Sequence, residues 1–425
     1  MNTITNTAFQ TAEKKDLFQT IQPLLNMFVF FVVFPCLDVM GNSVTFYIFL
    51  YIVFSIGIFW TTSFRGKTLL FLFLLFVFLS NSLAPYDRIR ERTFVNAFTI
   101  SIQFTYWIFL ACFMIVFRNK INLYQLSKWV FYGVVAAVIG YFLFVIKFGG
   151  GGVSINTKMP RNAYVFTMLC SMPLAFYYLM QRYSKFVVYF ILLCFVVALL
   201  LTNGRSGAII IMLESVFIFI LFNPGLLKFL KVAFIPMFLG VLFLQSDFIE
   251  PYMETLAEKV EPLSPRLASL IVGEEEGDLT QDKSWLHRKL MIDKSIEIFE
   301  EFPLLGIGAT NFSKFDSELE TFDDDKYYRL SNHDRDWYNN RSAHNTYVQV
   351  LSEFGIIGLT IFIILLLIPL LFLVRLLFNN NFKIYHLPLI SLLGMSIHFY
   401  AISTITGAVP WMVLGLAIAS TYRKT

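Results

Sequence analysis

Charged residues are scarce in this sequence of 425 residues: Asp, Glu, Lys and Arg make up 15% of it, whereas soluble domains average about 25%. Hydrophobic residues account for 57% and aromatic residues for 18%, and the mean hydropathy is +0.66. This scarcity of charge excludes a globular enzyme that is attached to the membrane by a single anchor. The composition instead predicts an all-α polytopic membrane protein.

Cysteine is also scarce, and its positions do not indicate a metal or redox site. The sequence contains no Walker loop, no dinucleotide fingerprint and no nucleic-acid motif, so we expect no nucleic-acid partner. The cysteines all fall in apolar runs, with neither a disulfide framework nor a zinc-binding spacing; they are Cys36, Cys112, Cys170 and Cys194.

Apolar runs of the length that a membrane helix needs, about 20 residues, recur along the chain. The first 21 residues are polar and lack a cleavage site, so we expect a retained tail and no signal peptide. We predict about twelve membrane spans, at residues 22–39, 44–60, 68–83, 94–117, 127–147, 162–181, 185–202, 206–223, 228–245, 354–378, 385–402 and 406–421.

The distribution of Lys and Arg predicts the orientation of these spans. With the N-terminus in the cytoplasm, the inner segments hold 15 of the 33 basic residues and the short outer loops hold 7. Because basic residues concentrate in cytoplasmic loops, both termini are predicted to be cytoplasmic. The long polar segment 246–353 then lies outside the cytoplasm, and it carries 23 of the 29 acidic residues.

This orientation divides the chain into a membrane part and one large external insertion between spans nine and ten. The predicted segments are a cytoplasmic tail at 1–21, spans one to nine at 22–245, an extracytoplasmic loop domain carrying the catalytic site at 246–353, spans ten to twelve at 354–421, and a cytoplasmic C-terminus at 422–425.

Within the external segment, the stretch SWLHRKLMIDKSIEIFEEF at residues 284–302 predicts an amphipathic helix with Ser284 as its N-cap. The stretch PLLGIGATNF, at 303–312, ends the helix. Arg288 lies at the edge of the expected buried face, where it either snorkels toward water or points into a cavity. The residues expected on that face share one side of the helix at helical spacing; they are Arg288, Ile292, Ser295, Ile296 and Phe299.

Two further arginines lie where outer loops enter the membrane. Arg205 follows the turn in LTNGRSG, and Arg161 lies in KMPRNAYVF, before the sixth span. A guanidinium group matches phosphate oxygens with two parallel hydrogen bonds, and a helix start adds free backbone N–H groups. Each arginine is therefore either a phosphate ligand or an interfacial anchor.

His344 lies in SAHNTYVQVLSEFGIIGL, residues 342–359, where the external segment re-enters the membrane. A histidine at such a boundary either has a structural role or takes a proton from a hydroxyl group near neutral pH. His344 and Asn345 are expected to begin a short helix. Nearby His333, Asp334 and Asp336 match no metal-binding signature, so we predict no metal site.

Glu214 is an ionisable residue inside a predicted span, in AIIIMLESVF. Such residues are costly in a bilayer and are usually paired or functional. His398, in span eleven, is a possible partner. The two residues form either a structural polar pair or part of a transport or relay pathway.

Three motifs occur together in a characteristic order: TNGRSGAIII, then LHRKLMIDKSIEIFEEFPLLGIGATNF, then AHNTYVQVLSEFGIIGL. In this order, and with the predicted topology, the chain resembles the O-antigen ligase/polymerase superfamily of bacterial membrane glycosyltransferases. The resemblance covers about residues 160–375 by motif and the whole chain by topology. It implies a GT-C-like arrangement of about twelve helices.

The resemblance implies a glycan donor linked to undecaprenyl diphosphate, used on the periplasmic face of the bacterial inner membrane. A ligase transfers the glycan to lipid A–core, a polymerase transfers it to another lipid-linked repeat, and related members transfer glycans to protein. His344 would be the general base, and Arg205 and Arg288 would hold the diphosphate, with Arg161 as a further candidate. The family implies neither a metal ion nor another cofactor.

Three hypotheses follow from the sequence. The first is a ligase that passes the glycan to lipid A–core by inverting displacement. The second is a polymerase of O-antigen, capsule or exopolysaccharide from the same superfamily. The third, from another class, is a polysaccharide transporter or flippase, for which Glu214, Asp38 and His398 would line a pathway. Transporters often have two similar halves, which this sequence lacks, and an external insertion of this size is atypical of them.

Overall fold

The chain is helical wherever the computed structural model describes it, which confirms the all-α class. No strand occurs in this part, apart from an isolated antiparallel bridge between Ile89 and Phe315. Two of the predicted spans, 44–60 and 228–245, lie outside it, so the number of spans stays a prediction. The described residues are 17–33, 67–90, 94–148, 161–200, 205–222, 283–317, 343–379, 381–400, 402–403 and 405–422.

The helix bounds follow the apolar runs closely, and six of the expected spans end within about two residues of a helix in the structure. The helices are α1 (Leu17–Val33), α3 (Thr68–Ser82), α4 (Phe94–Val116), α5 (Leu123–Phe148), α6 (Arg161–Arg182), α7 (Lys185–Leu200), α8 (Arg205–Leu221), α12 (Lys283–Glu301), α14 (Thr346–Phe378), α15 (Leu387–His398) and α16 (Ala408–Thr421), with short 3₁₀ turns η1 (Tyr86–Arg88), η3 (Phe312–Lys314) and η6 (Ile384–His386).

Among the described residues, three helical stretches are long and apolar enough to cross a membrane. They are Ala97–Val116, Leu123–Gly140 and Thr346–Phe378, and the remaining apolar helices are shorter. Together with the composition, these helices identify a membrane protein.

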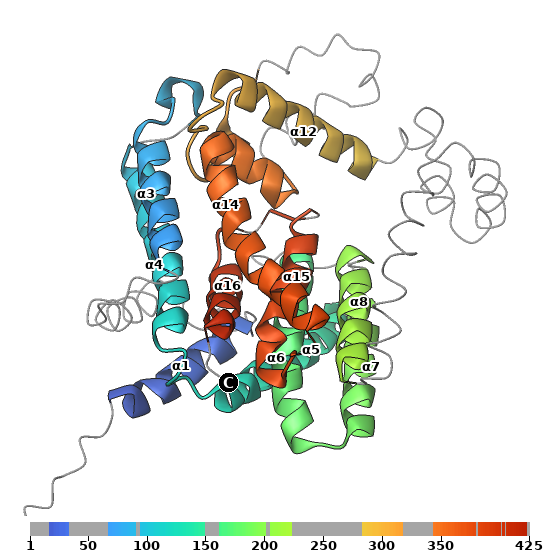
Figure 1. Ribbon diagram of the computed structural model, residues 1–425. Helices are drawn as coiled ribbons and strands as arrows, with labels where there is room; N and C mark the ends of the chain where they lie inside the picture. The colour runs from blue at the N-terminus through green and yellow to red at the C-terminus, as the bar shows by residue number, and fades with distance from the viewer. Residues whose placement is uncertain are drawn as a thin grey trace, which may run out of the picture.

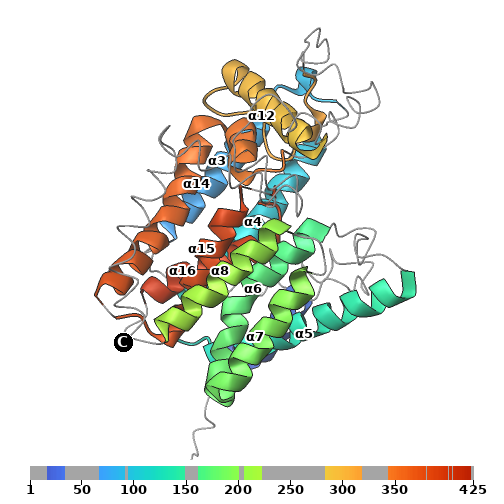
Figure 2. The same ribbon diagram turned by 90° about the vertical axis from the view of Figure 1, so that its right-hand side faces the viewer.

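The helices form a bundle with α12 lying across one end and the C-terminus near the other (Figures 1 and 2). Within the bundle, α4 packs against α3 and α16, and α6 packs against α5, α8 and α15. The helix α15 also contacts α14 and α16, so it links the two halves of the bundle. Its C-terminal end is therefore adjacent to several helix ends at once.

Aromatic rings fasten four of these helices together. Trp411 of α16 is 1% exposed, and its indole N–H donates to the Ile405 carbonyl at 2.9 Å. Its ring centroid lies 5.6 Å from that of Phe73 in α3 and 6.3 Å from that of Phe104 in α4. Phe354 of α14 contacts both phenylalanine rings. Such contacts stabilise the core beyond simple burial, and they hold the helices that carry the site.

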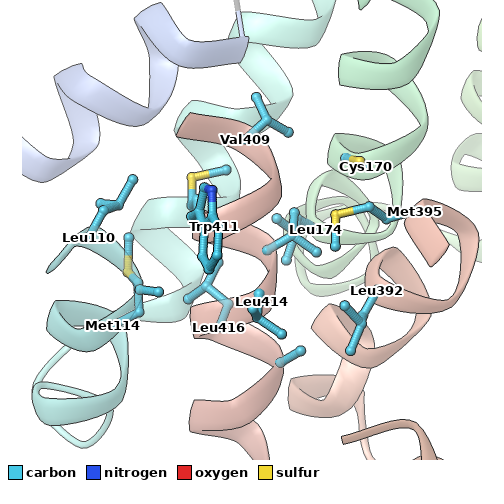
Figure 3. Close-up of a cluster of buried hydrophobic side chains, with 14 of the residues drawn as sticks. Leu110, Met114, Cys170, Leu174, Leu392, Met395, Val409, Trp411, Leu414 and Leu416 are labelled. Atoms are coloured by element: carbon cyan, nitrogen blue, oxygen red, sulfur yellow. The ribbon is translucent and has the colours of Figure 1, made fainter. Parts of the chain in front are cut away.

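A neighbouring part of the same core joins α4, α6, α15 and α16. Leu110 and Met114 of α4 lie on one side of Trp411, and Leu174 of α6 and Met395 of α15 lie on the other (Figure 3). These side chains are almost fully buried. Close-packed interiors resist displacement. This part of the core therefore fixes the positions of α4, α6, α15 and α16 relative to one another.

Candidate active site at the outer ends of the helices

His344 lies at a sharp bend in the backbone directly before α14. Its φ is 50°, in the left-handed region that non-glycine residues adopt rarely and that histidine tolerates better than most. The side chain is half-buried. Ala343 before it is 2% exposed. The bend is thus held between a buried residue and a helix start, and such backbone strain often marks functional positions.

Asn345 is the N-cap of α14, so the helix begins at Thr346, and His344 lies outside it. The Asn345 side-chain oxygen accepts hydrogen bonds from the backbone N–H groups of Tyr347 at 3.0 Å and Val348 at 3.2 Å. Asparagine is among the best N-cap residues for this reason. The expected short helix is therefore present, but His344 and Asn345 precede it.

The start of α14 is fastened to the end of α15. The backbone N–H of Thr346 donates to the Phe399 carbonyl at 2.7 Å, and its hydroxyl donates to the Ile402 carbonyl. The Tyr347 hydroxyl donates to the Ser396 carbonyl at 2.6 Å. These bonds fix the position of His344, two residues before Thr346, relative to α15.

The same end of α15 contacts the first turns of α6 and α8. The His398 ring stacks on Phe166 of α6 with centroids 5.9 Å apart. A Cβ atom placed on Gly207 of α8 would lie 3.7 Å from His398 Cε1 and would overlap Val165 of α6. The backbones of α6, α8 and α15 therefore meet around His398.

This packing brings the starts of two arginine-bearing helices toward the His344 segment. Arg161 is the first residue of α6 and precedes Val165 by one helical turn. Arg205 is the first residue of α8 and precedes Gly207 by two residues. Their side chains lie outside the described residues, so the structure places their backbones only.

Arg288 lies on α12. Leu290 and Met291, two and three residues further on, are fully buried in a small core that also contains Ala343 and is contacted by Val348. The turn that carries Arg288 is therefore close to the segment that carries His344. As for the other arginines, only the backbone of Arg288 is described.

The predicted buried face of α12 is wrong for Ile292 and Ile296 and correct for Ser295, which is 1% exposed. Ile292 and Ile296 are 38% and 48% exposed, whereas the buried side of the helix is a neighbouring stripe of residues. The reason is that residues 303–315 double back over this stripe. The buried residues are Leu290, Met291, Lys294, Ser295 and Ile298. The expected N-cap is also wrong, because α12 begins at Lys283 and Ser284 is inside its first turn.

Lys294 explains how the returning segment is held. Its side chain is fully buried, and its ammonium group donates to the Phe315 carbonyl at 3.0 Å and lies 5.4 Å from the centre of the Phe312 ring. Arg88 and Arg90, in the turn after α3, form ion pairs with Glu301 at 3.2 Å and Asp316 at 2.5 Å. These basic residues therefore attach the external segment to the bundle.

The external segment meets α14 through a pair of glycines. Gly306 and Gly355 both have positive φ, at 66° and 63°, and Gly355 marks a kink inside α14. Backbone hydrogen bonds join residues 303–308 to residues 352–356 of α14. The Ile307 N–H donates to the Ser352 carbonyl at 3.1 Å, and the Gly308 N–H donates to the Glu353 carbonyl at 2.8 Å. In the other direction, the Ile356 N–H donates to the Pro303 carbonyl at 2.8 Å.

Sequence reasoning missed two polar residues that support this junction. The Ser80 hydroxyl lies 2.8 Å from the Leu305 carbonyl and 3.0 Å from the Glu353 carbonyl, so its proton is shared between them. The Asn81 side-chain oxygen accepts from the Ala309 N–H at 2.7 Å. The signal was the polar triplet Ser80-Asn81-Ser82 at the end of an apolar run.

Glu214 and His398 do not form the structural polar pair that was one of the two expectations for them. Among the described residues, neither carboxylate oxygen of Glu214 and neither ring nitrogen of His398 has a hydrogen-bond partner. Glu214 instead packs against Gly394 of α15, where a Cβ atom would overlap its carboxylate. Both residues lie in the contact between α8 and α15.

No group of three or more His, Cys, Asp or Glu residues that could hold a metal ion occurs in the described part of the chain. His333, Asp334 and Asp336 lie outside it. The arrangement near α15 consists instead of one strained histidine and three arginine-bearing helical turns. This set of groups is suited to moving a proton near a multiply charged anion.

Residues 188–363 match the family model described as O-antigen ligase. This match supports the resemblance of the chain to the O-antigen ligase/polymerase superfamily. The matched range includes Arg205, Arg288 and His344 and leaves out Arg161. No curated protein matches the sequence. The match over this range, together with the apolar helices, supports a membrane glycosyltransferase of ligase or polymerase type.

Proposed function

We propose that this protein transfers a glycan from undecaprenyl diphosphate to a sugar hydroxyl of lipid A–core, at the periplasmic face of the inner membrane. The observation that carries the proposal is the packing of α15. Its last residues bond to the start of α14 beside His344, and they contact the first turns of α6 and α8 beside Arg161 and Arg205. The buried core around Ala343 adds the turn that carries Arg288.

The reaction is a single displacement at the anomeric carbon. The acceptor hydroxyl oxygen forms a bond to that carbon while the bond between the carbon and the diphosphate oxygen breaks, and the configuration inverts. The His344 imidazole takes the hydroxyl proton, and the diphosphate leaves with the bonding electron pair. Because the diphosphate is already a good leaving group, the transfer needs no nucleotide. A histidine base contributes roughly 10²–10⁴ in rate.

The arginines stabilise the charge that gathers on the departing diphosphate. Arg205 and Arg161 each begin a helix, where backbone N–H groups also face outward and the helix dipole favours an anion. Arg288 approaches from the external side. A well-placed donor in a site partly shielded from water contributes about 3–4 kcal/mol to such a transition state. The apolar helices would hold the polyprenyl chain.

The test is glycan transfer by purified protein in proteoliposomes that contain undecaprenyl-diphosphate-linked glycan, with EDTA present. Three acceptors are compared: lipid A–core, a second lipid-linked repeat, and none. Transfer to lipid A–core by the native protein, and its loss in His344→Gln with the fold retained, is the expected result. Transfer only to the lipid-linked repeat would replace the ligase with a polymerase of the same superfamily.

Other outcomes would reject parts of the proposal. Full activity of His344→Gln would exclude His344 as the base, and inactivity caused by EDTA alone would exclude the metal-independent reaction. Flipping of the lipid-linked glycan across the bilayer without transfer would favour the transporter hypothesis.

The arginine roles need a matched control on the same helix. Arg161 begins α6 and Arg182 ends it, exposed at the opposite end of the bundle. We expect Arg205→Gln and Arg288→Gln to lower the transfer rate by about 10²-fold or more, with a smaller loss for Arg161→Gln. Arg182→Gln should be fully active. Equal losses in all four variants would indicate a general effect of charge and not a diphosphate site.

A further inference from the structure

A recess lies at the end of the bundle opposite α12, where α4 and α16 end and α5 and α15 begin. It encloses about 300 Å³, including space open to the outside. Its walls are mostly apolar, and three polar side chains, Arg118, Tyr385 and Ser420, are also part of its lining. The recess is separate from the outer helix ends around His398, and it has no part in the proposed transfer.

Two of these polar groups have unused hydrogen-bonding capacity. Arg118 lies over the Tyr422 ring, 5.7 Å from its centroid, and one of its NH groups donates to the Ile115 carbonyl at 3.1 Å. Its Nε–H and the Tyr385 hydroxyl, however, have no partner among the described residues. The Ser420 hydroxyl is already bonded to Ala417 O at 2.7 Å.

Buried donors without acceptors are uncommon in folded proteins and cost about 1–3 kcal/mol each. Two such donors on one recess therefore indicate a ligand that accepts hydrogen bonds. The guanidinium of Arg118 is fixed by the Tyr422 ring and by the Ile115 carbonyl, so its remaining donor is already oriented. A ligand oxygen would complete the set once the side chains that cover these donors shift, because both donor atoms are buried in the structure.

The charge around the recess is of one sign. Arg118, Lys120 and Lys383 lie in the two turns that border it, and Arg423 and Lys424 follow Tyr422 in the sequence. No acidic residue occurs in 114–124, 379–388 or 411–425. The ligand is therefore an anion. The distribution of basic residues predicts that this end of the bundle faces the cytoplasm.

We propose that this recess binds the phosphate of an anionic phospholipid of the inner leaflet, with one acyl chain lying along its apolar wall. Arg118 provides a charge-assisted hydrogen bond to a phosphate oxygen, and the Tyr385 hydroxyl donates a second. Met114 and Leu416, which line the recess, offer apolar surface to the chain. Basic recesses between membrane helices on the cytoplasmic side are suited to anionic headgroups.

The experiment compares retention of lipid by the purified full-length protein. Detergent-solubilised protein is mixed with phosphatidylglycerol, phosphatidylcholine or inorganic phosphate alone. Bound lipid is counted by native mass spectrometry, and the thermal unfolding midpoint is measured in each mixture. We expect phosphatidylglycerol to be retained and to raise the midpoint, and the other two probes to do neither. Arg118→Gln should weaken retention by roughly tenfold, as expected for one charge-assisted bond.

Two further variants separate a specific site from general effects. Tyr385→Phe removes only a hydroxyl that has no described partner, so it should fold normally and should also weaken retention, by a few-fold. Lys128→Gln is the matched control, because Lys128 is another cation over an aromatic ring, 5.7 Å from the Tyr132 centroid, and it does not line the recess. It should retain phosphatidylglycerol fully.

Several results would overturn the proposal. Equal retention by the native protein, Arg118→Gln and Tyr385→Phe would exclude these donors. Equal retention of phosphatidylcholine would mean that the recess selects no charge. A rise in the unfolding midpoint with inorganic phosphate alone, as large as with phosphatidylglycerol, would show a site for free anions and not for a lipid.

Discussion

Two of the contacts that depend on glycine differ in whether their polar groups form hydrogen bonds. At the first, Gly306 and Gly355 allow residues 303–308 to pack against α14, and the backbone groups of the two segments form hydrogen bonds with each other. At the second, Gly394 lets α15 approach Glu214 of α8. There, Glu214 and His398 are 4% and 2% exposed.

The difference shows which contact is built for stability. The first contact has hydrogen bonds between backbones and a supporting serine, so it fixes residues 303–308 against α14, which begins two residues after His344. The second keeps ionisable groups that have no partner among the described residues, and such groups destabilise a helix contact. A close fit of side chain to glycine, and not polar pairing, holds α8 against α15.

The largest effect is expected at the first contact. In Gly355→Ala, the new Cβ atom would overlap the Leu304 carbonyl, and the backbone would be forced to keep a φ of 63°. Backbone strain alone costs about 1–3 kcal/mol, and the overlap involves backbone that cannot rotate away. We expect a loss of more than about 3 kcal/mol in unfolding free energy together with loss of transfer, measured by denaturant unfolding in detergent and by the proteoliposome assay.

Gly407→Ala provides the control for this variant. Gly407 has an extended φ of −169°, and the nearest atom to a new Cβ would be Pro410 Cδ at 3.8 Å. Its stability should change by less than about 0.5 kcal/mol. If Gly355→Ala were as stable as Gly407→Ala, the kink in α14 would not be needed for the junction.

The second contact should respond less strongly, because its overlap involves a flexible side chain. In Gly394→Ala, the new methyl group would overlap the Glu214 carboxylate, and we expect a loss of about 1–3 kcal/mol from overpacking. The double variant Gly394→Ala with Glu214→Ala should recover part of this loss, as a double-mutant cycle would measure. Strict additivity of the two changes would contradict direct packing of Glu214 on Gly394.

Ser80→Ala tests the polar support of the first contact. The hydroxyl shares its proton between the carbonyls of Leu305 and Glu353, and its removal leaves both without this donor. A loss of about 1–2 kcal/mol is expected, without a change in the fold. Thr360→Ala, which removes an exposed hydroxyl bonded within α14, should cost less. A larger loss in Thr360→Ala would assign the effect to helix α14 and not to the junction.

Much of the fold follows from the sequence, because apolar runs determine where the helices lie. The ends of α3, α4, α6 and α7 fall within about two residues of the expected spans. The order of the motifs also predicted a site that combines Arg205, Arg288 and His344. Whether these side chains converge stays a prediction. The structure brings the start of α8 near the His344 segment through α15, which carries no residue of the predicted site, so the role of α15 could not be read from the motifs.

Two details of the external segment could not be predicted for a physical reason. Helix α12 has two apolar stripes of similar length, and only the return of residues 303–315 decides that Leu290 and Ile298 are buried instead of Ile292 and Ile296. The kink at Gly355 could not be predicted from the sequence, because the pattern of apolar residues continues through it. The N-cap at Asn345 agrees with the preference of asparagine for this position, although we expected Asn345 to lie inside the helix.

The smallest effect is expected for Glu214→Gln, and it shows whether the second contact depends on charge. Glutamine keeps the length and shape of the side chain that fits against Gly394, and it carries no charge. Since an unpaired charge in an apolar helix contact is strongly destabilising, the neutral variant should be as stable as the native protein to within about 1 kcal/mol, or more stable. A loss of more than about 2 kcal/mol would mean that a charged carboxylate is held there by a counter-charge. Unchanged stability with loss of transfer would instead give Glu214 a part in the reaction. The loss of transfer could then not be attributed to packing, because glutamine fits against Gly394 in the same way.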